Sequence, residues 1–211
     1  MTLLGLRVRG LAPGEPYDMD VEIAAVSEAA GSGPVHLAGF SAGATVALAA
    51  ALALGDPVRS VALLEPAFIG DDDWHPAETR WRAAIGSLRA TATAEQVEGF
   101  RAMLVAPGVP PPASRGPVAW DFRDDLLAAM LTTRTGFESA DLARLQAPIL
   151  LIGGGRSSPR FGRAARRLIA VCPRASEHVF PTLHHFAPPY RDEPGELARL
   201  LPTFWSRHDP R

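Results

Sequence analysis

The stretch from residue 34 to residue 53 constrains the fold of this chain more than any other. A short apolar run at residues 35–38 leads into Gly39-Phe40-Ser41-Ala42-Gly43, and a long run rich in alanine and leucine follows. This order predicts a strand, a tight turn and a helix. A serine at the point of such a turn adopts strained backbone geometry. We therefore expect residues almost without side chains two positions before and two positions after it, and Gly39 and Gly43 stand there.

The same turn makes Ser41 a candidate nucleophile. It would lift the hydroxyl clear of the sheet and place it at the N-terminus of the next helix, whose unpaired N–H groups stabilise a developing negative charge. The Ala42 N–H is the natural first donor to such an oxyanion. A G-x-S-x-G pentapeptide alone is a weak pattern and also fits an accidental Gly-Ser turn. The flanking strand and helix favour the nucleophile interpretation.

Composition narrows the class of protein. The 211 residues suffice for one domain with a sizeable core, and a net charge of −2 gives no electrostatic reason to expect a nucleic acid or an anionic membrane as partner. The single cysteine, Cys172, excludes an internal disulfide framework and fits a reducing cytoplasm. The six histidines show no metal-ligand spacing, and no apolar run has the form of a signal peptide or membrane span. We expect a cytoplasmic protein that needs no metal or other cofactor.

The order of elements predicts the fold class. Strands are expected at residues 2–8, 35–38, 58–64, 149–153 and 177–180. Helices are expected at residues 18–30, 44–54, 160–171 and 194–205. Strands and helices that alternate with short loops predict an α/β fold, a mostly parallel sheet of about five strands with helices on both faces.

The segment between residues 66 and 147 follows a different pattern. Apolar residues recur at helical spacing over residues 74–90, 93–105 and 123–131, and a proline-rich stretch lies at 107–112. We interpret this segment as a helical lid or cap over the strand ends, where ligands bind in open α/β sheets. A packing extension without a gating role is the alternative. The predicted organisation is a core of residues 1–65 and 148–211 with a lid at 66–147.

A pair of histidines, His184 and His185, lies in a proline-bounded loop after the last predicted strand. With the Gly-x-Ser-x-Gly turn and this order of elements, the chain resembles the α/β-hydrolase superfamily over about residues 1–205. The resemblance implies that Ser41 is the nucleophile and that His185 is the general base and acid, with His184 as the alternate.

The acid of the triad is a first departure from the family pattern. In the family it usually stands on the loop after the strand that residues 149–153 resemble, but residues 154–159 contain no carboxylate. Some members place a glutamate at the end of the preceding strand, which here is Glu65. A carboxylate that closes an apolar strand is costly without a donor partner, and an imidazole N–H would supply one. We therefore favour Glu65 over the aspartates at 71–73, among which Asp72 is the alternate.

The N-terminal part is a second departure. A full member has further strands and a loop with a second oxyanion donor upstream of the segment that residues 2–10 resemble. Without them, the edge of residues 35–38 would stay unpaired. Three alternatives follow. The chain starts earlier; or residues 2–8 take the vacant place, with Arg9-Gly10-Leu11 as an oxyanion loop; or the edge pairs with a partner such as a second copy in a homodimer.

The resemblance implies a serine hydrolase that cleaves a carboxylic ester or similar acyl substrate through an acyl-enzyme. Large apolar residues in the predicted helical segment suggest that this small-molecule substrate carries an apolar acyl or alcohol group, although each of them also fits ordinary helix packing; they are Trp74, Trp81, Phe100 and Met103. The alternative is a catalytically impaired scaffold that binds a small molecule or a partner in the same cleft.

Overall fold

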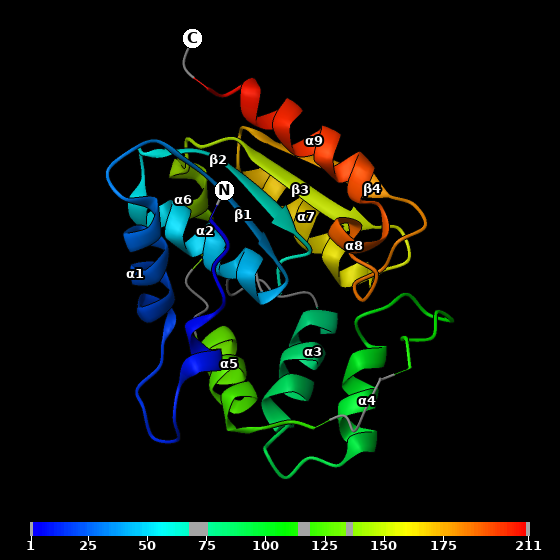
Figure 1. The fold of residues 1–211 in the computed structure, drawn as a ribbon. Coiled ribbons are helices and arrows are strands. Elements are labelled where there is room, and N and C mark those ends of the chain that lie inside the picture. Colours follow the sequence, from blue (N-terminus) through cyan, green and yellow to red (C-terminus); the bar gives the residue numbers. More distant parts are fainter. Residues whose placement is uncertain (1, 68–75, 114–118, 134–136, 210–211) are drawn as a thin grey trace.

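The computed structural model describes residues 2–67, 76–113, 119–133 and 137–209. Their sheet consists of parallel strands in the order β1-β2-β3-β4 (Figure 1). The strands are β1 (Val35–Phe40), β2 (Val58–Leu64), β3 (Ile149–Gly154) and β4 (Ala175–Phe180). The order along the sheet is the order along the chain, so each connection leads to the next strand on the same side of the preceding one.

The strand register brings the carboxyl ends of all four strands to one edge of the sheet. Phe40 pairs with Leu64, Leu64 with Ile152, and Gly154 with Phe180. The two central strands are almost entirely buried, which is why β2 and β3 read as continuous apolar runs rather than as alternating ones. The residues that follow β1, β2 and β4 therefore lie close together in space.

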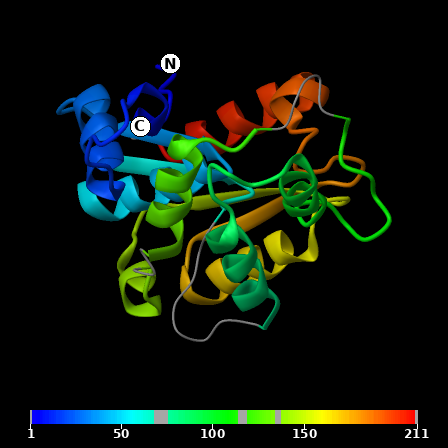
Figure 2. The ribbon, with the colours of Figure 1, turned by 90° about the horizontal axis from the view of Figure 1, so that it is seen from below.

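Helices cover both faces of the sheet (Figure 2). The helices α1 (Met19–Ala30), α2 (Ala42–Leu54) and α7 (Pro159–Val171) share one apolar core with the sheet. On the other face, α9 (Pro194–Ser206) packs Leu197 and Phe204 against Leu150 and Ile152. The run of alanine and leucine in α2 is buried almost all round, whereas α7 and α9 are amphipathic. The predicted fold class is confirmed.

The helices α3 (Pro76–Ser87), α4 (Ala94–Ala102) and α5 (Phe122–Thr133), between β2 and β3, lie beyond the carboxyl ends of the strands, below the arrowheads (Figure 1). The short α6 (Ser139–Arg144) follows them and lies at the opposite end of the sheet, close to the start of β3. The sequence predicts the first three within a few residues and misses α6. A short helix α8 (Pro189–Asp192) in the proline-rich loop before α9 is also missed. The division into core and lid stays a prediction, and so does any movement of these helices.

The predicted strand at residues 2–8 is wrong. Residues 2–6 form no regular element, and a 3-10 helix, η1 (Arg7–Gly10), follows. Leu3 and Leu4 are 85% and 49% exposed, so the apolar run does not enter the sheet. Instead the N–H groups of Arg7 and Val8 donate to the Glu22 carboxylate in α1, at 3.0 and 3.3 Å.

The sheet therefore differs from the predicted one in two ways. It has four strands rather than about five, and among the described strands β1 pairs with β2 alone. Of the three alternatives for this edge, the one in which residues 2–8 fill the place beside β1 is therefore wrong, and residues 9–11 follow no strand from which they could serve as an oxyanion loop. None of the helices in the described ranges combines the length and the apolar character that crossing a bilayer requires.

Candidate active site

Ser41 occupies the sharp turn between β1 and α2. Its φ is 54°, and among the non-glycine residues that the structure describes only Glu65, at 44°, shares a positive φ. Such backbone is strained and persists only where the surroundings hold it. Here the Ser41 N–H donates to Leu64 O at 2.9 Å, and Ser41 O accepts from the N–H groups of Ala44, Thr45 and Ala67 at 3.0, 3.2 and 3.1 Å.

The two glycines of the turn have different roles. A Cβ added at Gly39 would lie 2.2 Å from Gly43 O and 2.7 Å from Ala44 N, both backbone atoms, so only hydrogen fits there. A Cβ added at Gly43 would meet nothing within 4 Å. The expectation that both positions must lack a side chain is met at Gly39 and wrong at Gly43. The close approach of strand and helix falls on the strand side of the turn.

The structure brings Ser41, His185 and Glu65 together in one chain of hydrogen bonds. Ser41 Oγ lies 3.1 Å from His185 Nε2, and His185 Nδ1 lies 2.8 Å from Glu65 Oε2. The Gly154 N–H donates to the other carboxylate oxygen, Glu65 Oε1, at 2.8 Å. A carboxylate facing Nδ1 fixes the proton on that nitrogen, which leaves Nε2 as the acceptor for the serine proton.

Aromatic rings hold the imidazole of His185 in this position. Phe161 in α7 stacks on it with a centroid distance of 4.7 Å and an interplanar angle of 7°, and Phe40 at the end of β1 lies 4.9 Å away. His185 and Glu65 are each only 6% exposed. The hydrogen bond between them therefore forms away from water, where it orients the ring more strongly. Sequence reasoning missed Phe161 and the Gly154 N–H, and a backbone donor leaves no signal in residue type.

The structure also bears on the alternate residues that the sequence offers for the histidine and the acid. His184 is partly exposed, and its Nδ1 accepts the Phe186 N–H at 3.2 Å. Burial, and then the charge of Arg156, lower the pKa of His184. The histidine that bonds Ser41 is therefore His185 and not His184. Asp72 and the aspartates beside it, together with Trp74, lie outside the described residues.

A comparison with protein families bears on this geometry. A model of the alpha/beta hydrolase family matches residues 2–200. The chain belongs to the α/β hydrolase family. No curated protein matches it.

Solved structures share the fold of this α/β hydrolase family member. A hydrolase from Pseudomonas aeruginosa is 19% identical with a TM-score of 0.62, and the alignment covers 92% of this chain and 74% of that one. A thermophilic esterase from Thermogutta terrifontis is 18% identical with a TM-score of 0.62, covering 92% and 75%. The carboxylesterase CesB from Bacillus subtilis is 15% identical with a TM-score of 0.56, covering 89% and 66%. At these identities the likeness concerns the fold.

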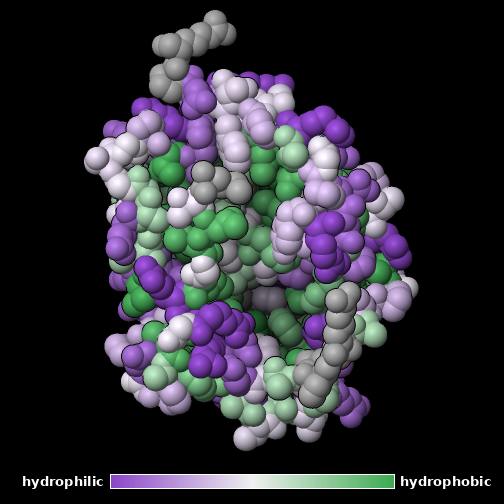
Figure 3. All heavy atoms as spheres, in the orientation of Figure 1, coloured by the Kyte–Doolittle hydropathy of each residue, from purple (hydrophilic) through white to green (hydrophobic). Residues whose placement is uncertain are grey.

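In this family member a cavity of about 190 Å³ opens at Ser41 and Ala42. Most of its wall is apolar and comes from the helices beyond the strand ends; it includes Trp81, Ile85, Phe100, Trp120, Leu127 and Leu131. The space-filling view shows hydrophobic residues around a hollow between the sheet and these helices (Figure 3). The sequence points to Trp81 and Phe100 but misses Trp120, which precedes α5 outside any periodic pattern. Met103 packs against the core.

Two charged side chains of the α/β hydrolase, Arg160 and Asp124, also reach this wall, and both are engaged within the protein. Arg160 is 5% exposed; its Nη2 donates to Glu78 Oε2 at 3.0 Å and to Ala67 O at 2.6 Å. Its guanidinium lies 3.7 Å from the centroid of Trp81. Burial lowers the pKa of Arg160, and the charge of Glu78 opposes this. Asp124 accepts from Arg9 Nη2 at 2.8 Å.

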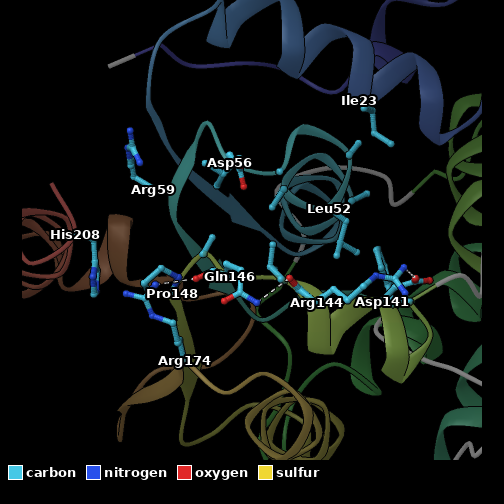
Figure 4. A pocket seen from close by; sticks show the side chains of 18 of the residues that line it. Ile23, Leu52, Asp56, Arg59, Asp141, Arg144, Gln146, Pro148, Arg174 and His208 are labelled. Carbon is cyan, nitrogen blue, oxygen red and sulfur yellow. Dashed lines mark hydrogen bonds and ion pairs between the residues drawn. The ribbon is translucent and has the colours of Figure 1, made fainter. Parts of the chain in front are cut away.

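Another cavity, of about 950 Å³, lies at the opposite end of the strands (Figure 4). Val58 at the start of β2 and Pro148 just before β3 line it, with Arg59, Arg174 and His208 around them. None of Ser41, His185 and Glu65 is part of its wall, so in this α/β hydrolase the larger cavity is not the one at the serine. Within the described ranges, no three His, Cys, Asp or Glu side chains gather in a way that could hold a metal ion.

Proposed function

We propose that the protein is a serine hydrolase that cleaves a carboxylic ester or similar acyl substrate through an acyl-enzyme. The observation that carries the proposal is the hydrogen-bond chain from Ser41 Oγ through His185 to Glu65. A partly exposed serine followed by a buried imidazole and a buried carboxylate has the relative geometry that nucleophilic acyl transfer requires. The strained turn at Ser41 and the apolar cavity at its hydroxyl support the same proposal.

Each residue has one role in the proposed mechanism. Ser41 Oγ attacks the carbonyl carbon while His185 Nε2 takes its proton, and Glu65 stabilises the imidazolium that forms. The carbonyl oxygen gains negative charge and accepts the Ala42 N–H, at the first position of α2, where the backbone donors have no acceptor within the helix. His185 then gives the proton to the leaving oxygen. Water, deprotonated by His185, attacks the acyl-enzyme, and Ser41 recovers its proton.

Labelling with a fluorophosphonate probe tests the proposal, because the probe reacts with an activated serine and does not require the natural substrate. We expect wild-type protein to be labelled and Ser41→Ala to be unlabelled. Ser87→Ala, which removes an exposed hydroxyl on α3, serves as the matched control and keeps the label. Thermal unfolding of all three proteins shows whether the fold is retained.

Wild type that is labelled no more than Ser41→Ala would contradict the proposal. It would favour the alternative of a hydrolase-like scaffold that binds a small molecule or a partner in the same cleft without cleaving it. Peptide mapping of the labelled protein identifies the modified residue. A label on any residue other than Ser41 would also contradict the proposal.

A further inference from the structure

We infer that the 190 Å³ cavity binds the acyl part of the substrate, and that it selects an uncharged acyl group with about six non-hydrogen atoms beyond the carbonyl. This inference rests on the proposed function and goes beyond it. It states which half of the ester lies under the helices, how large that half is and what charge it carries. Three features of the cavity carry it: the position of the reacting groups, the volume and the state of the charged wall residues.

The position of the reacting groups assigns the cavity to the acyl half. Ser41 and Ala42 are part of its wall, and His185 is not among the described residues that line it. The acyl carbon stays bonded to Ser41 Oγ and its oxygen faces the Ala42 N–H, whereas the leaving oxygen must take a proton from His185 Nε2. The group that extends from Ser41 into the cavity is therefore the one that remains on the enzyme. The alcohol leaves on the histidine side.

The volume limits the acyl group. A water molecule takes about 30 Å³ in the liquid and a methylene group is of similar size, so the cavity has room for about six such units. The wall residues Trp81, Ile85 and Leu131 are buried in the main core. Enlarging the cavity around a longer chain would displace closely packed side chains, which is costly. Beyond the carbonyl group, the pentyl chain of a hexanoyl group and the phenyl ring of a benzoyl group fit this limit, and the undecyl chain of a dodecanoyl group exceeds it.

The charged wall residues favour an uncharged group. The Arg160 guanidinium is bonded to Glu78 and stacked on Trp81, and the Asp124 carboxylate is bonded to Arg9. A carboxylate on the acyl chain would have to compete with Glu78 for Arg160 and would lie in the same wall as Asp124. Burying an anion without a dedicated partner is costly. An apolar chain instead contacts the aromatic and aliphatic side chains that form most of the wall.

Two ester series test the assignment to the acyl half. In the first series the leaving group is always p-nitrophenol and the acyl chain grows from acetate to dodecanoate. In the second series the acyl group is always acetyl and the alcohol grows from methanol to octanol. We expect kcat/KM to rise at least about tenfold from acetate to hexanoate and to fall at least about tenfold by dodecanoate. Across the alcohol series it should change less than about threefold. The opposite result would overturn the assignment.

Two variants change the cavity in opposite directions. Trp120→Ala enlarges it and should move the optimum of the acyl series to longer chains, while Ala128→Leu fills it and should move the optimum to shorter ones. Trp205→Ala is the matched control, because it removes the same side chain from α9 on the other face of the sheet. A shift in the alcohol series, or an acyl optimum that both cavity variants leave unchanged, would overturn the inference. Opposite shifts cannot arise from a general loss of folding.

A charged ester tests the third feature. The p-nitrophenyl monoester of adipate has the same number of acyl carbons as the hexanoate ester and carries a carboxylate in place of the terminal methyl group. We expect its kcat/KM to be at least about tenfold lower, and equal or better hydrolysis would overturn the uncharged assignment. Fluorophosphonate labelling of the same preparations separates the two proposals. Labelled Ser41 with a flat acyl series overturns only the inference, and absence of labelling overturns the proposed function together with it.

Discussion

Glu65 and Glu22 are the buried glutamates of the described residues, 6% and 2% exposed, and they lie in regions with different tasks. Each accepts hydrogen bonds from the backbone and from one side chain. Glu65 accepts from the Gly154 N–H and from His185 Nδ1. Glu22 accepts from two N–H groups of the N-terminal segment, at Arg7 and Val8, and from the Tyr17 hydroxyl at 2.7 Å.

The difference lies in the side-chain donor. An imidazole gains and loses a proton near neutral pH, and its second nitrogen stays available to a neighbour, here Ser41. A phenol keeps its proton up to about pH 10 and offers no such relay. A buried carboxylate therefore supports proton transfer at Glu65, by our proposal, whereas at Glu22 it stabilises the position of the N-terminal segment. A buried, fully bonded glutamate does not by itself mark an active site.

The sharpest test of this contrast is Glu65→Gln. The glutamine Oε1 can still accept the Gly154 N–H, but its amide NH₂ then faces His185 Nδ1 and favours the tautomer with the proton on Nε2, which cannot take the serine proton. We expect kcat for an ester to fall by about 10²–10⁴. Steady-state kinetics measures this, with Asp72→Asn as the control that loses the same charge and retains activity. Equal and small effects in both variants would remove Glu65 from the triad.

The next largest expected effect concerns the turn at Ser41, in the same region as Glu65, and is a loss of stability. Gly39→Ala forces a Cβ against the backbone of Gly43, so we expect the free energy of unfolding to fall by about 3 kcal/mol. Gly43→Ala has open space and adds a better helix former to α2, so its free energy of unfolding should stay within about 1 kcal/mol of wild type. Urea denaturation of the two variants compares them directly. Equal losses would mean that the turn is not limited by this contact.

Glu22→Gln makes the corresponding change in the other region. Its amide NH₂ would face groups that all donate, so one of them loses its acceptor in a buried place. We expect the free energy of unfolding to fall by about 1–3 kcal/mol, with ester hydrolysis within about twofold of wild type. Glu28→Gln, at an exposed position of the same helix, is the control and should change neither quantity. A large loss of activity in Glu22→Gln without a loss of stability would contradict the contrast.

The smallest expected effect concerns pH. Burial, and then the hydrogen bond to Glu22, raise the pKa of Tyr17 above its usual 10.0. In the unfolded chain the phenol ionises near pH 10 while the folded protein keeps the proton, so this contribution is complete below pH 10 and is lost as the pH rises further. Because Tyr17 is partly exposed, we expect less than about 1 kcal/mol per pH unit. Urea denaturation at pH 8 and pH 10.8 should show this decrease in wild type and not in Tyr17→Phe.

The parts of the fold that the sequence predicts are those with long, uniform patterns. The alanine-rich run of α2 and the apolar runs of β2 and β3 have one plausible conformation each. The run at residues 2–8 looks equally apolar, yet a strand also needs a neighbour to pair with, and sequence pattern alone does not supply one. Glu22 carries a local signal of its buried position, which the predicted elements do not use. It stands between Met19 and Ala25 on the buried stripe of α1, where a carboxylate is costly without donors.

The candidate site also contains residues that a local sequence pattern indicates and residues that only the fold brings into place. Ser41 lies in a local pattern, and Glu65 is conspicuous because it closes an apolar strand. His185 comes from the resemblance to a family, and only the fold shows that it rather than His184 reaches the serine. Trp120 and Phe161 could not be assigned, because their role depends on where α5 and α7 pack and not on their own surroundings in the chain.

The hydrogen bonds around Ser41 have a consequence for how a ligand is aligned. Its carbonyl oxygen receives N–H groups from α2 and from Ala67, while its own N–H reaches Leu64, so the peptide groups on either side of the serine are anchored to two different elements. Rotation about the Cα–Cβ bond is then the main freedom left to the hydroxyl. When ligands differ in shape, the ligand and the helices that line the cavity must adjust. The reacting oxygen of Ser41 stays in nearly the same position.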